Sequence, residues 1–375
     1  MKIVLAPNTF KESLAAPDVC KAMEKGIRAA GFSGEIKSVP MADGGDGTMD
    51  ALVAATGGEI RSMTATDPLG RPVEATFGLL GGGNAAVVEM AQASGLWRLT
   101  LEERNPSLTS THGTGDLIRA ALDAGATTIV VGIGGSATVE GGAGMAESLG
   151  YRFLDSSNKP IRPTGGNLRD IRAIDASGVD AAIRGARFRV ACDVDNPLLG
   201  THGAATVYGP QKGATPEMID LLEEGLSNLA RLWEHDLDVQ VKDTPGAGAA
   251  GGLGAGLVAF CRAEIVPGFD LIAELSGLDN ALEGADLVFT GEGRVDQSTG
   301  YGKVPAGVAR RAHAKSIPVV CLAGEVIGDV SDLHQIGITA ILPIVPGPTD
   351  LQTSIQEAAG LLSRATEQVM RLRMA

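Results

Sequence analysis

Residues 127–144 read TTIVVGIGGSATVEGGAG, an apolar segment that runs directly into a glycine-rich loop. The Thr, Ile and Val residues before Gly132 predict a buried strand, because β-branched side chains suit a pleated, covered surface. The residues after Gly144 predict a helix. Glycines at such a connection let successive backbone N–H groups approach an anion, and the helix N-terminus adds a positive dipole. A tight turn that needs glycine only for its backbone angles is the alternative interpretation.

The glycines and hydroxyls of this loop are therefore candidates for binding the phosphate groups of a nucleotide. Ser136 and Thr138 can each offer a hydroxyl to a phosphate oxygen or to Mg²⁺. The full candidate set is Gly134, Gly135, Ser136, Ala137, Thr138, Gly141 and Gly142.

The same loop also imitates the dinucleotide fingerprint of NAD-binding proteins. Gly132, Gly134 and Ala137 have the G-x-G-x-x-A spacing, and Asp155 follows at about the position of the acidic residue that binds the ribose. The fingerprint needs a helix that begins inside the motif, and the later glycines of the loop would interrupt that helix. An NAD(P)-dependent oxidoreductase that uses the Gly132–Ala137 loop is the alternative function.

The two ends of the chain share a pattern of short apolar segments and amphipathic segments. Strands are predicted at residues 2–6, 36–40, 287–290, 319–323 and 338–342, and helices at 19–30, 304–315 and 351–371. Alternating strands and helices are typical of a parallel sheet covered by helices. We therefore predict that both ends combine into one Rossmann-like parallel-sheet domain.

The middle of the chain has a different pattern, in which strand-like runs are separated by tight turns. Runs at 61–65, 73–80 and 85–90 flank turns at 68–72 and 81–84, which suggests antiparallel hairpins. The predicted fold is α/β with two unlike domains. Residues 1–65 and 285–375 form a discontinuous parallel-sheet domain, and residues 66–284 form an inserted mixed-sheet α/β domain.

Composition and charge exclude several classes of partner. The chain has a formal net charge of −14 over 375 residues and no run of basic residues, so it lacks the cationic patches that nucleic-acid binding requires. No stretch of 18 apolar residues occurs, so we expect no membrane span. Cys20, Cys192, Cys261 and Cys321 lie far apart with no C-x-x-C pair, which indicates reduced thiols in a cytoplasmic protein.

Three loops combine carboxylates with glycine or turn residues, and each follows a predicted strand. They are DGGDG at 43–47, CDVDNP at 192–197 and TGEGRVD at 290–296. Open α/β sheets bind ligands at this edge, and Mg²⁺ usually takes one or two carboxylates together with phosphate oxygens and waters. Taken singly, each loop is explained equally well as an Asp-containing turn.

An acidic protein that binds an anionic substrate must place cations locally. Lys11, Arg71, Lys212 and Arg294 each lie in a predicted loop or turn. Lys11 and Arg294 are the stronger candidates, because they follow predicted strands at the edge where such sheets bind ligands.

Nine stretches, taken in order along the chain, resemble the glycerate kinase type-1 family. They are APNTFK (6–11), MADGGDGT (41–48), DPLGR (67–71), GTGD (113–116), the loop at 132–144, CDVDNPL (192–198), YGPQKG (208–213), residues 246–256 and TGEGRVD (290–296). Together they cover most of the chain and are far more specific than any one of them. Asn8, Glu12 and Asp46 depart from the residues that members often have there, and Asn8 removes a carboxylate that could have bound a metal.

The resemblance implies a kinase that transfers the γ-phosphoryl group of ATP to a hydroxyl of D-glycerate with Mg²⁺ as cofactor. It also implies 2-phosphoglycerate as the product, and two unlike α/β domains with the active site in the cleft between them. D-Glycerate and ATP would be the binding partners. The residues leave open the regiochemistry and whether the chain forms a homo-oligomer.

Each candidate residue has a role in this implied reaction. The segment Gly134–Thr138, together with Gly141 and Gly142, would bind the ATP phosphates. The glycerate carboxylate or the transferring group would be bound by Lys11, Arg71 and Arg294. The candidate metal ligands are Asp193, Glu292 and Asp296. Asp193 is also the candidate acceptor of the substrate hydroxyl proton, which makes Asp193, Lys11 and Arg294 the candidate catalytic set.

A two-lobed sensor that binds ATP or a sugar acid without producing ADP is a third hypothesis. The three acidic loops argue against it, because a protein that only senses an anion has little need of carboxylates near the phosphate groups.

Overall fold

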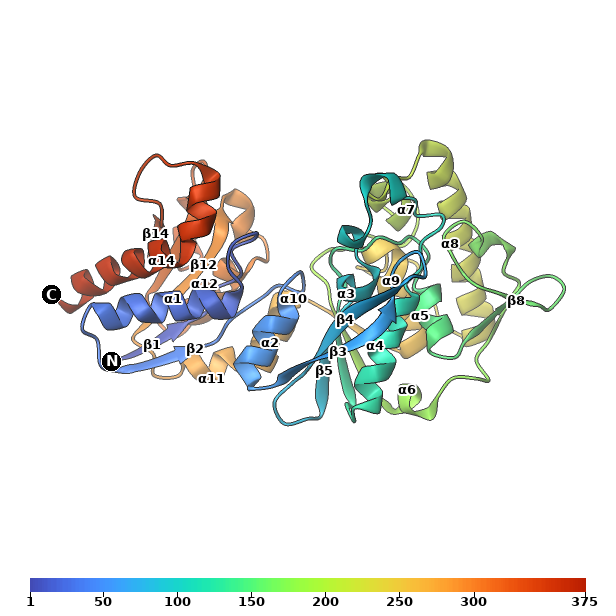
Figure 1. The fold of residues 1–375 in the computed structure, drawn as a ribbon, viewed down its shortest axis with the longest axis horizontal. Coiled ribbons are helices and arrows are strands. Elements are labelled where there is room, and N and C mark those ends of the chain that lie inside the picture. The colour runs from blue at the N-terminus through green and yellow to red at the C-terminus, as the bar shows by residue number, and fades with distance from the viewer. The chain divides into compact units, whose positions relative to one another are not determined.

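The computed structural model describes all 375 residues, which divide into two compact units (Figure 1). Unit 1 comprises Met1–Asp43, Asp50–Gly57 and Gly268–Ala375, and unit 2 comprises Gly44–Met49 and Gly58–Pro267. Both ends of the chain therefore belong to the same unit. The predicted α/β class is confirmed.

Unit 1 is built on a five-stranded sheet in which every neighbouring pair is parallel. The strand order is β14-β13-β12-β1-β2. Their bounds are β1 (Lys2–Leu5), β2 (Glu35–Ser38), β12 (Leu287–Val295), β13 (Val319–Val326) and β14 (Ala340–Pro343). The helices of this unit are α1 (Ala16–Ala29), α10 (Gly268–Ser276), α11 (Leu278–Leu282), α12 (Val304–His313), α13 (Asp332–Gln335) and α14 (Leu351–Met374), with most of α2 (Thr48–Thr56).

Both faces of this sheet are covered, as its continuous apolar strands predict. Ile3 and Leu5 lie in one core cluster with side chains of α1 and α14, and Val4, which points to the opposite face, is also 0% exposed. Figure 1 shows α1 and α14 running side by side. A Cβ on Gly26 of α1 would lie 2.1 Å from the carbonyl oxygen of Ser363, so the helices can approach this closely only because residue 26 is glycine.

Unit 2 contains a mixed six-stranded sheet of order β11-β10-β6-β5-β4-β3. The first four strands are mutually parallel, and β4 pairs antiparallel with both β5 and β3. Their bounds are β3 (Glu59–Thr66), β4 (Pro72–Leu79), β5 (Ala85–Glu89), β6 (Thr128–Gly132), β10 (Arg187–Ala191) and β11 (Glu264–Val266). A separate antiparallel sheet consists of β7 (Arg152–Leu154), β8 (Pro160–Ile161) and β9 (Ala173–Asp175).

The helices of unit 2 pack around one large apolar core that includes Val131, Phe188 and Trp233. They are α3 (Ala91–Ser94), α4 (His112–Asp123), α5 (Ala143–Ser148), α6 (Ala181–Gly185), α7 (Ala204–Tyr208), α8 (Pro216–Leu237) and α9 (Ala249–Cys261). Short 3-10 turns connect several of them, among them η4 (Pro210–Lys212).

Two segments next to the predicted domain boundaries at residues 65 and 285 are placed by their contacts. Strand β3 pairs with β4 along its whole length, so residues 59–65 lie in the sheet of unit 2. Residues 268–284 form α10 and α11, which belong to unit 1. Strand pairing and helix packing decide both cases, and neither is visible in the local hydrophobic pattern.

Candidate functional site

The parallel strands of unit 2 end at one edge of the sheet, and the glycine-rich loop leaves from the middle of that edge. Gly132, the last residue of β6, lies in register with Glu89 at the end of β5 and with Ala191 at the end of β10. Residues 44–46 pack against the same edge, since a Cβ on Gly44 would lie 2.8 Å from the Cβ of Ala191. Three of the predicted loops therefore meet where α/β sheets bind ligands.

The first part of the glycine-rich loop is open to solvent. Gly134 and Gly135 are exposed, whereas Ser136 is only 7% exposed. Gly135 has a φ of +71°, a conformation that favours glycine. The backbone is fixed on both sides of this turn, because Leu96 N–H donates to the Gly135 carbonyl at 2.8 Å and Ala137 N–H donates to the Ser94 carbonyl at 3.0 Å.

The second part of the loop is packed inside unit 2. Gly141 N–H donates to the Gly251 carbonyl at 3.0 Å. A Cβ on Gly141 would lie 2.6 Å from Leu229 Cδ2 of α8, and one on Gly142 would lie 3.1 Å from Leu253 Cδ1 of α9. The sequence assigns both glycines to phosphate binding, but the structure uses them for close packing between helices. Ala137 and Thr138 are also buried, each 1% exposed.

Glu140 anchors the buried part of the loop, and the sequence analysis did not single it out. Its side chain is 0% exposed and accepts hydrogen bonds from Thr111 N–H at 3.1 Å, from the Thr111 hydroxyl and from Gly144 N–H at 2.8 Å. Burial raises the pKa of Glu140, while these donors favour its charged form. The only sign of its importance in the sequence is that Glu140 is the one charged residue in a loop of small and apolar residues.

Lys212 is a buried cation beneath the same loop. It ends the 3-10 turn η4, is 1% exposed, and is followed by Gly213 with a φ of +91°. Its Nζ atom lies 2.6 Å from the Ser136 hydroxyl oxygen and 2.6 Å from the Thr138 carbonyl oxygen. The sequence indicated a cation in a loop here, but not its burial or its partners.

Asp193 is exposed in the loop that follows β10. The loop around it is held at several points. Asn196 accepts a hydrogen bond from the Tyr208 hydroxyl at 2.7 Å and donates to the His202 carbonyl at 2.9 Å, and Gly248 N–H donates to the Asn196 carbonyl at 2.9 Å. The structure therefore places the exposed Asp193 on a supported loop at the carboxyl edge of the sheet.

Arg71 occupies the turn between β3 and β4, where two carboxylates bind it. Asp67 is 2% exposed and accepts from Arg71 Nε at 2.5 Å and from the backbone N–H groups of Leu69 and Arg71. Glu103 accepts from Arg71 NH1 at 2.5 Å. The positive charge of Arg71 balances the buried negative charge of Asp67, so the position of this arginine is explained without a bound ligand.

Unit 1 brings four of the predicted charged residues close together. Strand β12 continues to Val295, so Glu292 and Arg294 lie within a strand and not in the loop that the sequence predicts from residue 291. Arg294 Nε lies 3.4 Å from Asp296 Oδ2. The backbone of Lys11 lies beside this strand, because its nitrogen is 3.4 Å from the position that a Cβ on Gly293 would take.

Lys303, which the sequence analysis did not single out, lies between the two carboxylates of this group. Its Nζ atom is 3.9 Å from Glu292 Oε1 and 3.9 Å from Asp296 Oδ1. Burial raises the pKa of Glu292, and a hydrogen bond from Thr299 and the charge of Lys303 oppose that rise. The hydrogen bond from Ser298 lowers the pKa of Asp296.

The donor set fits a divalent cation that is shared with a ligand better than one held by the protein alone. No group of three or more His, Cys, Asp or Glu side chains converges to form a metal site. Mg²⁺ usually requires only one or two carboxylates and takes its remaining ligands from phosphate oxygens and water. Within unit 1, Glu292 and Asp296 offer two such carboxylates, and within unit 2 the exposed Asp193 offers one.

The interpretation of the loop as a dinucleotide fingerprint is wrong. The helix after β6 begins only at Ala143, beyond the whole G-x-G-x-x-A segment. Asp155 follows β7, which belongs to the separate antiparallel sheet and does not pair with β6. Its carboxylate accepts from the backbone N–H groups of Ser157 and Lys159 and so closes a hairpin turn.

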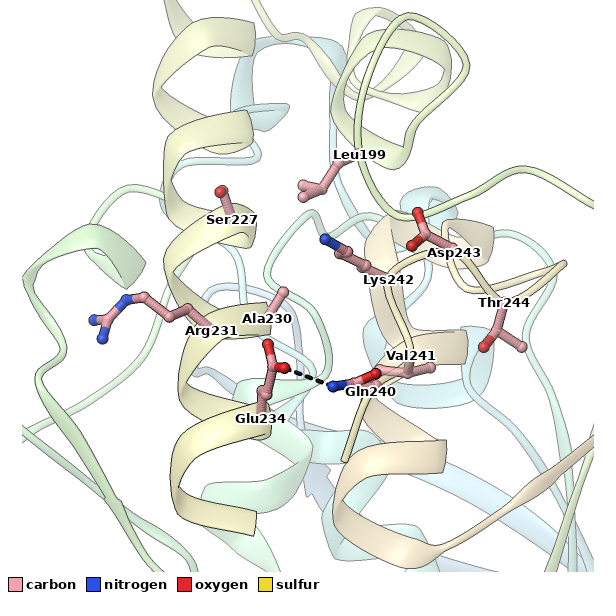
Figure 2. A pocket seen from close by; sticks show the side chains of 10 residues that line it. All are labelled: Leu199, Ser227, Ala230, Arg231, Glu234, Gln240, Val241, Lys242, Asp243 and Thr244. Carbon is pink, nitrogen blue, oxygen red and sulfur yellow. Dashed lines mark hydrogen bonds between the residues drawn. The ribbon is translucent and has the colours of Figure 1, made fainter. Parts of the chain in front are cut away.

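A separate pocket of about 800 Å³ in unit 2 contains none of the predicted site residues (Figure 2). Side chains of α8 and of residues 240–244 line most of it, with charges of both signs such as Arg231, Glu234 and Lys242. Gln240 donates to Glu234 at 2.6 Å.

Comparison with known proteins determines the family. The sequence profile of the glycerate kinase family matches residues 3–374. The chain belongs to the glycerate kinase family. A glycerate kinase of Bacillus subtilis is 46% identical over 98% of this chain and 97% of its own length, and a glycerate 2-kinase of Escherichia coli is 45% identical over the same shares. A crystal structure from Salmonella typhimurium LT2, assigned as glycerate kinase 2, matches with a TM-score of 0.92 and 43% identity, covering 100% of this chain and 98% of that one.

Membership of the glycerate kinase family confirms the resemblance that the nine motifs indicated. The protein is a kinase, and hence a transferase, and nothing in its structure supports the oxidoreductase alternative.

All four cysteines are free thiols. None of the helices combines the length and apolar character needed to cross a bilayer.

The close packing of the loop predicts a large cost for one small substitution. Gly251 has a φ of +72°, and a Cβ on it would lie 1.9 Å from the Thr138 carbonyl oxygen. We expect Gly251→Ala to lower the free energy of unfolding by more than about 3 kcal/mol, because backbone must move to admit the methyl group. Urea unfolding followed by circular dichroism measures this.

Gly83→Ala is the matched control in the same unit. Gly83 also has a positive φ, +77°, but a Cβ there would meet no atom within 4 Å. The free energy of unfolding of Gly83→Ala should fall by only about 1–2 kcal/mol, which is the cost of the left-handed conformation for alanine. Equal losses for the two variants would show that the close approach at Gly251 is not what holds the loop.

Proposed function

We propose that this chain transfers the γ-phosphoryl group of ATP to the 2-hydroxyl of D-glycerate, with Mg²⁺, and forms 2-phosphoglycerate and ADP. The observation that supports it most directly is the exposed Gly134–Gly135 turn beside Ser136 at the carboxyl edge of the unit 2 sheet. A relative that is 45% identical is a glycerate 2-kinase, which supports this product.

The exposed turn is the proposed site for the ATP phosphates. Backbone N–H groups at Gly134 and Gly135 can approach phosphate oxygens because no side chain intervenes, and Ser136 can donate its hydroxyl. Of the sequence candidates, these three therefore make the direct contacts. Ala137, Thr138, Gly141 and Gly142 act by holding the turn in place, since all four are buried.

Asp193 is the proposed acceptor of the proton of the glycerate hydroxyl. The hydroxyl oxygen forms a bond to the γ-phosphorus, the bond from that phosphorus to the bridging oxygen of ADP breaks, and the proton passes to the Asp193 carboxylate. Its exposure on a supported loop favours this role, because the group must reach the substrate without rearrangement.

Cations and carboxylates of unit 1 complete the proposed assignment. Lys11 and Arg294 bind the glycerate carboxylate or the transferring group, and Arg71 of unit 2 is a weaker candidate, because Asp67 and Glu103 already pair with it. The metal ligands are chosen from Asp193, Glu292 and Asp296. When bound, Mg²⁺ neutralises charge on the phosphate oxygens.

An ADP-release assay with product analysis tests the proposal. The purified chain with ATP, Mg²⁺ and D-glycerate should release ADP, and ³¹P-coupled NMR should find the phosphate on carbon 2. ADP release that does not depend on glycerate would contradict the proposal that D-glycerate accepts the phosphoryl group. Phosphate on carbon 3 would contradict the regiochemistry and leave the kinase assignment intact.

Asp193→Asn should lower kcat by roughly 100-fold or more, the range for loss of a general base. Asp195→Asn is the control, because Asp195 is an exposed carboxylate of the same loop. It should leave kcat within about twofold of the wild-type value. Near-normal turnover of Asp193→Asn would remove Asp193 from the proposed mechanism.

Arg294→Ala should raise KM for D-glycerate by roughly 10- to 100-fold, because a hydrogen bond to a charged group contributes about 1.5–3 kcal/mol. Arg364→Ala, which removes an exposed arginine of α14 in the same unit, should change neither KM. If only the KM for ATP rises in Arg294→Ala, the assignment of Arg294 to glycerate is wrong.

A further inference from the structure

Lys212 is a buried lysine to which the proposed chemistry assigns no step. It is 1% exposed and one of the largest fully buried side chains of the chain. Lysine is almost never buried to this extent unless it is paired, because burial removes the hydration of the ammonium group. Here the ammonium group contacts the Ser136 hydroxyl and the Thr138 carbonyl, both at 2.6 Å.

The chemistry of the two groups sets the direction of the bond to Ser136. An ammonium group has three N–H donors and no acceptor, so the Ser136 oxygen must accept from Lys212. The proton of the Ser136 hydroxyl is then left for another acceptor. Ser136 directly follows the exposed Gly134–Gly135 turn, so an anion bound at that turn can accept this proton.

We propose that Lys212 is a positioning residue, which acts through Ser136 and the Thr138 carbonyl to hold the turn in its phosphate-binding form. The inference rests on the proposed function in one respect, namely that this turn binds the phosphates. Lys212 itself does not touch the ligand. Its ammonium group keeps the Ser136 hydroxyl oriented as a donor.

The protonation state of Lys212 controls this orientation. Burial lowers the pKa of Lys212 to about 7, and the charge of Glu140 opposes that shift. Arg104 also packs here, with its backbone against Gly213. A neutral amine has a lone pair and can accept from Ser136, which would withdraw the hydroxyl proton from the ligand. Bound phosphate therefore favours the ammonium form, and binding should be coupled to uptake of a proton.

Calorimetry with inorganic tripolyphosphate measures this coupling without any turnover. At pH 7.5, titrations in buffers of different ionisation enthalpy should show that the wild type takes up roughly half a proton or more beyond the uptake by Lys212→Met. Lys242→Met is the control, because Lys242 is an exposed lysine of the same unit. Proton uptake by Lys242→Met should equal that of the wild type. Equal proton uptake by Lys212→Met and wild type would overturn the inference.

A double-mutant cycle tests whether Lys212 acts through Ser136. Lys212→Met should raise KM for ATP roughly tenfold and KM for D-glycerate less than about twofold. In the Ser136→Ala background, the same substitution should raise KM for ATP by less than about threefold. A tenfold effect in both backgrounds would show that Lys212 does not act through the hydroxyl.

Two further results separate the ways in which the inference can fail. If Lys212→Met does not fold, the wild-type KM for ATP should still rise between pH 7 and 9 as Lys212 loses its proton, and this rise should shrink in Ser136→Ala. An identical rise in both proteins would overturn the inference. If the wild type binds neither tripolyphosphate nor ATP, the proposed function itself fails. Binding with proton uptake that is independent of Lys212 contradicts the positioning role alone.

Discussion

Two buried charges, one within the glycine-rich loop and one beneath it, are the constraint on which the rest of unit 2 depends. Glu140 and Lys212 are both almost fully buried, and a buried charge that loses its partners costs several kcal/mol. Each is therefore surrounded by backbone and hydroxyl groups, Glu140 by Thr111 and Gly144 and Lys212 by Ser136 and Thr138. In the loop that these contacts hold, the first glycines are exposed and the last glycines are buried.

Glycine makes that conformation sterically feasible. Gly251 and Gly256 of α9 lie so close to the loop backbone that a Cβ would come within 1.9 Å of the Thr138 carbonyl and 2.2 Å of the Gly141 carbonyl. The chain contains 52 glycines, and a part of this excess is explained by helices that pack directly on backbone. The turn proposed to bind phosphate is ordered before any ligand arrives, so binding there would cost little conformational entropy.

Local patterns predicted much of this arrangement. The alternation of apolar segments at both chain ends predicted a parallel sheet with helices, and nine short motifs in order predicted the family, which the whole-chain match confirms. The dinucleotide interpretation failed because spacing alone cannot show that β7 leaves the sheet of β6. Gly141 and Gly142 show the limit of such patterns, because a glycine looks the same in a sequence whether it lies against an anion or against a neighbouring helix.

The sequence by itself determined the α/β class, the family and the strand-end loops, because these depend on residue periodicity and on motifs that are contiguous in the chain. Only the tertiary structure decided which loop residues face solvent and which are buried. It also decided that Lys212, 76 positions from Ser136, is the cation beneath the loop. The physical reason is that burial and charge pairing arise between residues far apart in the chain, whereas periodicity reports only on neighbours.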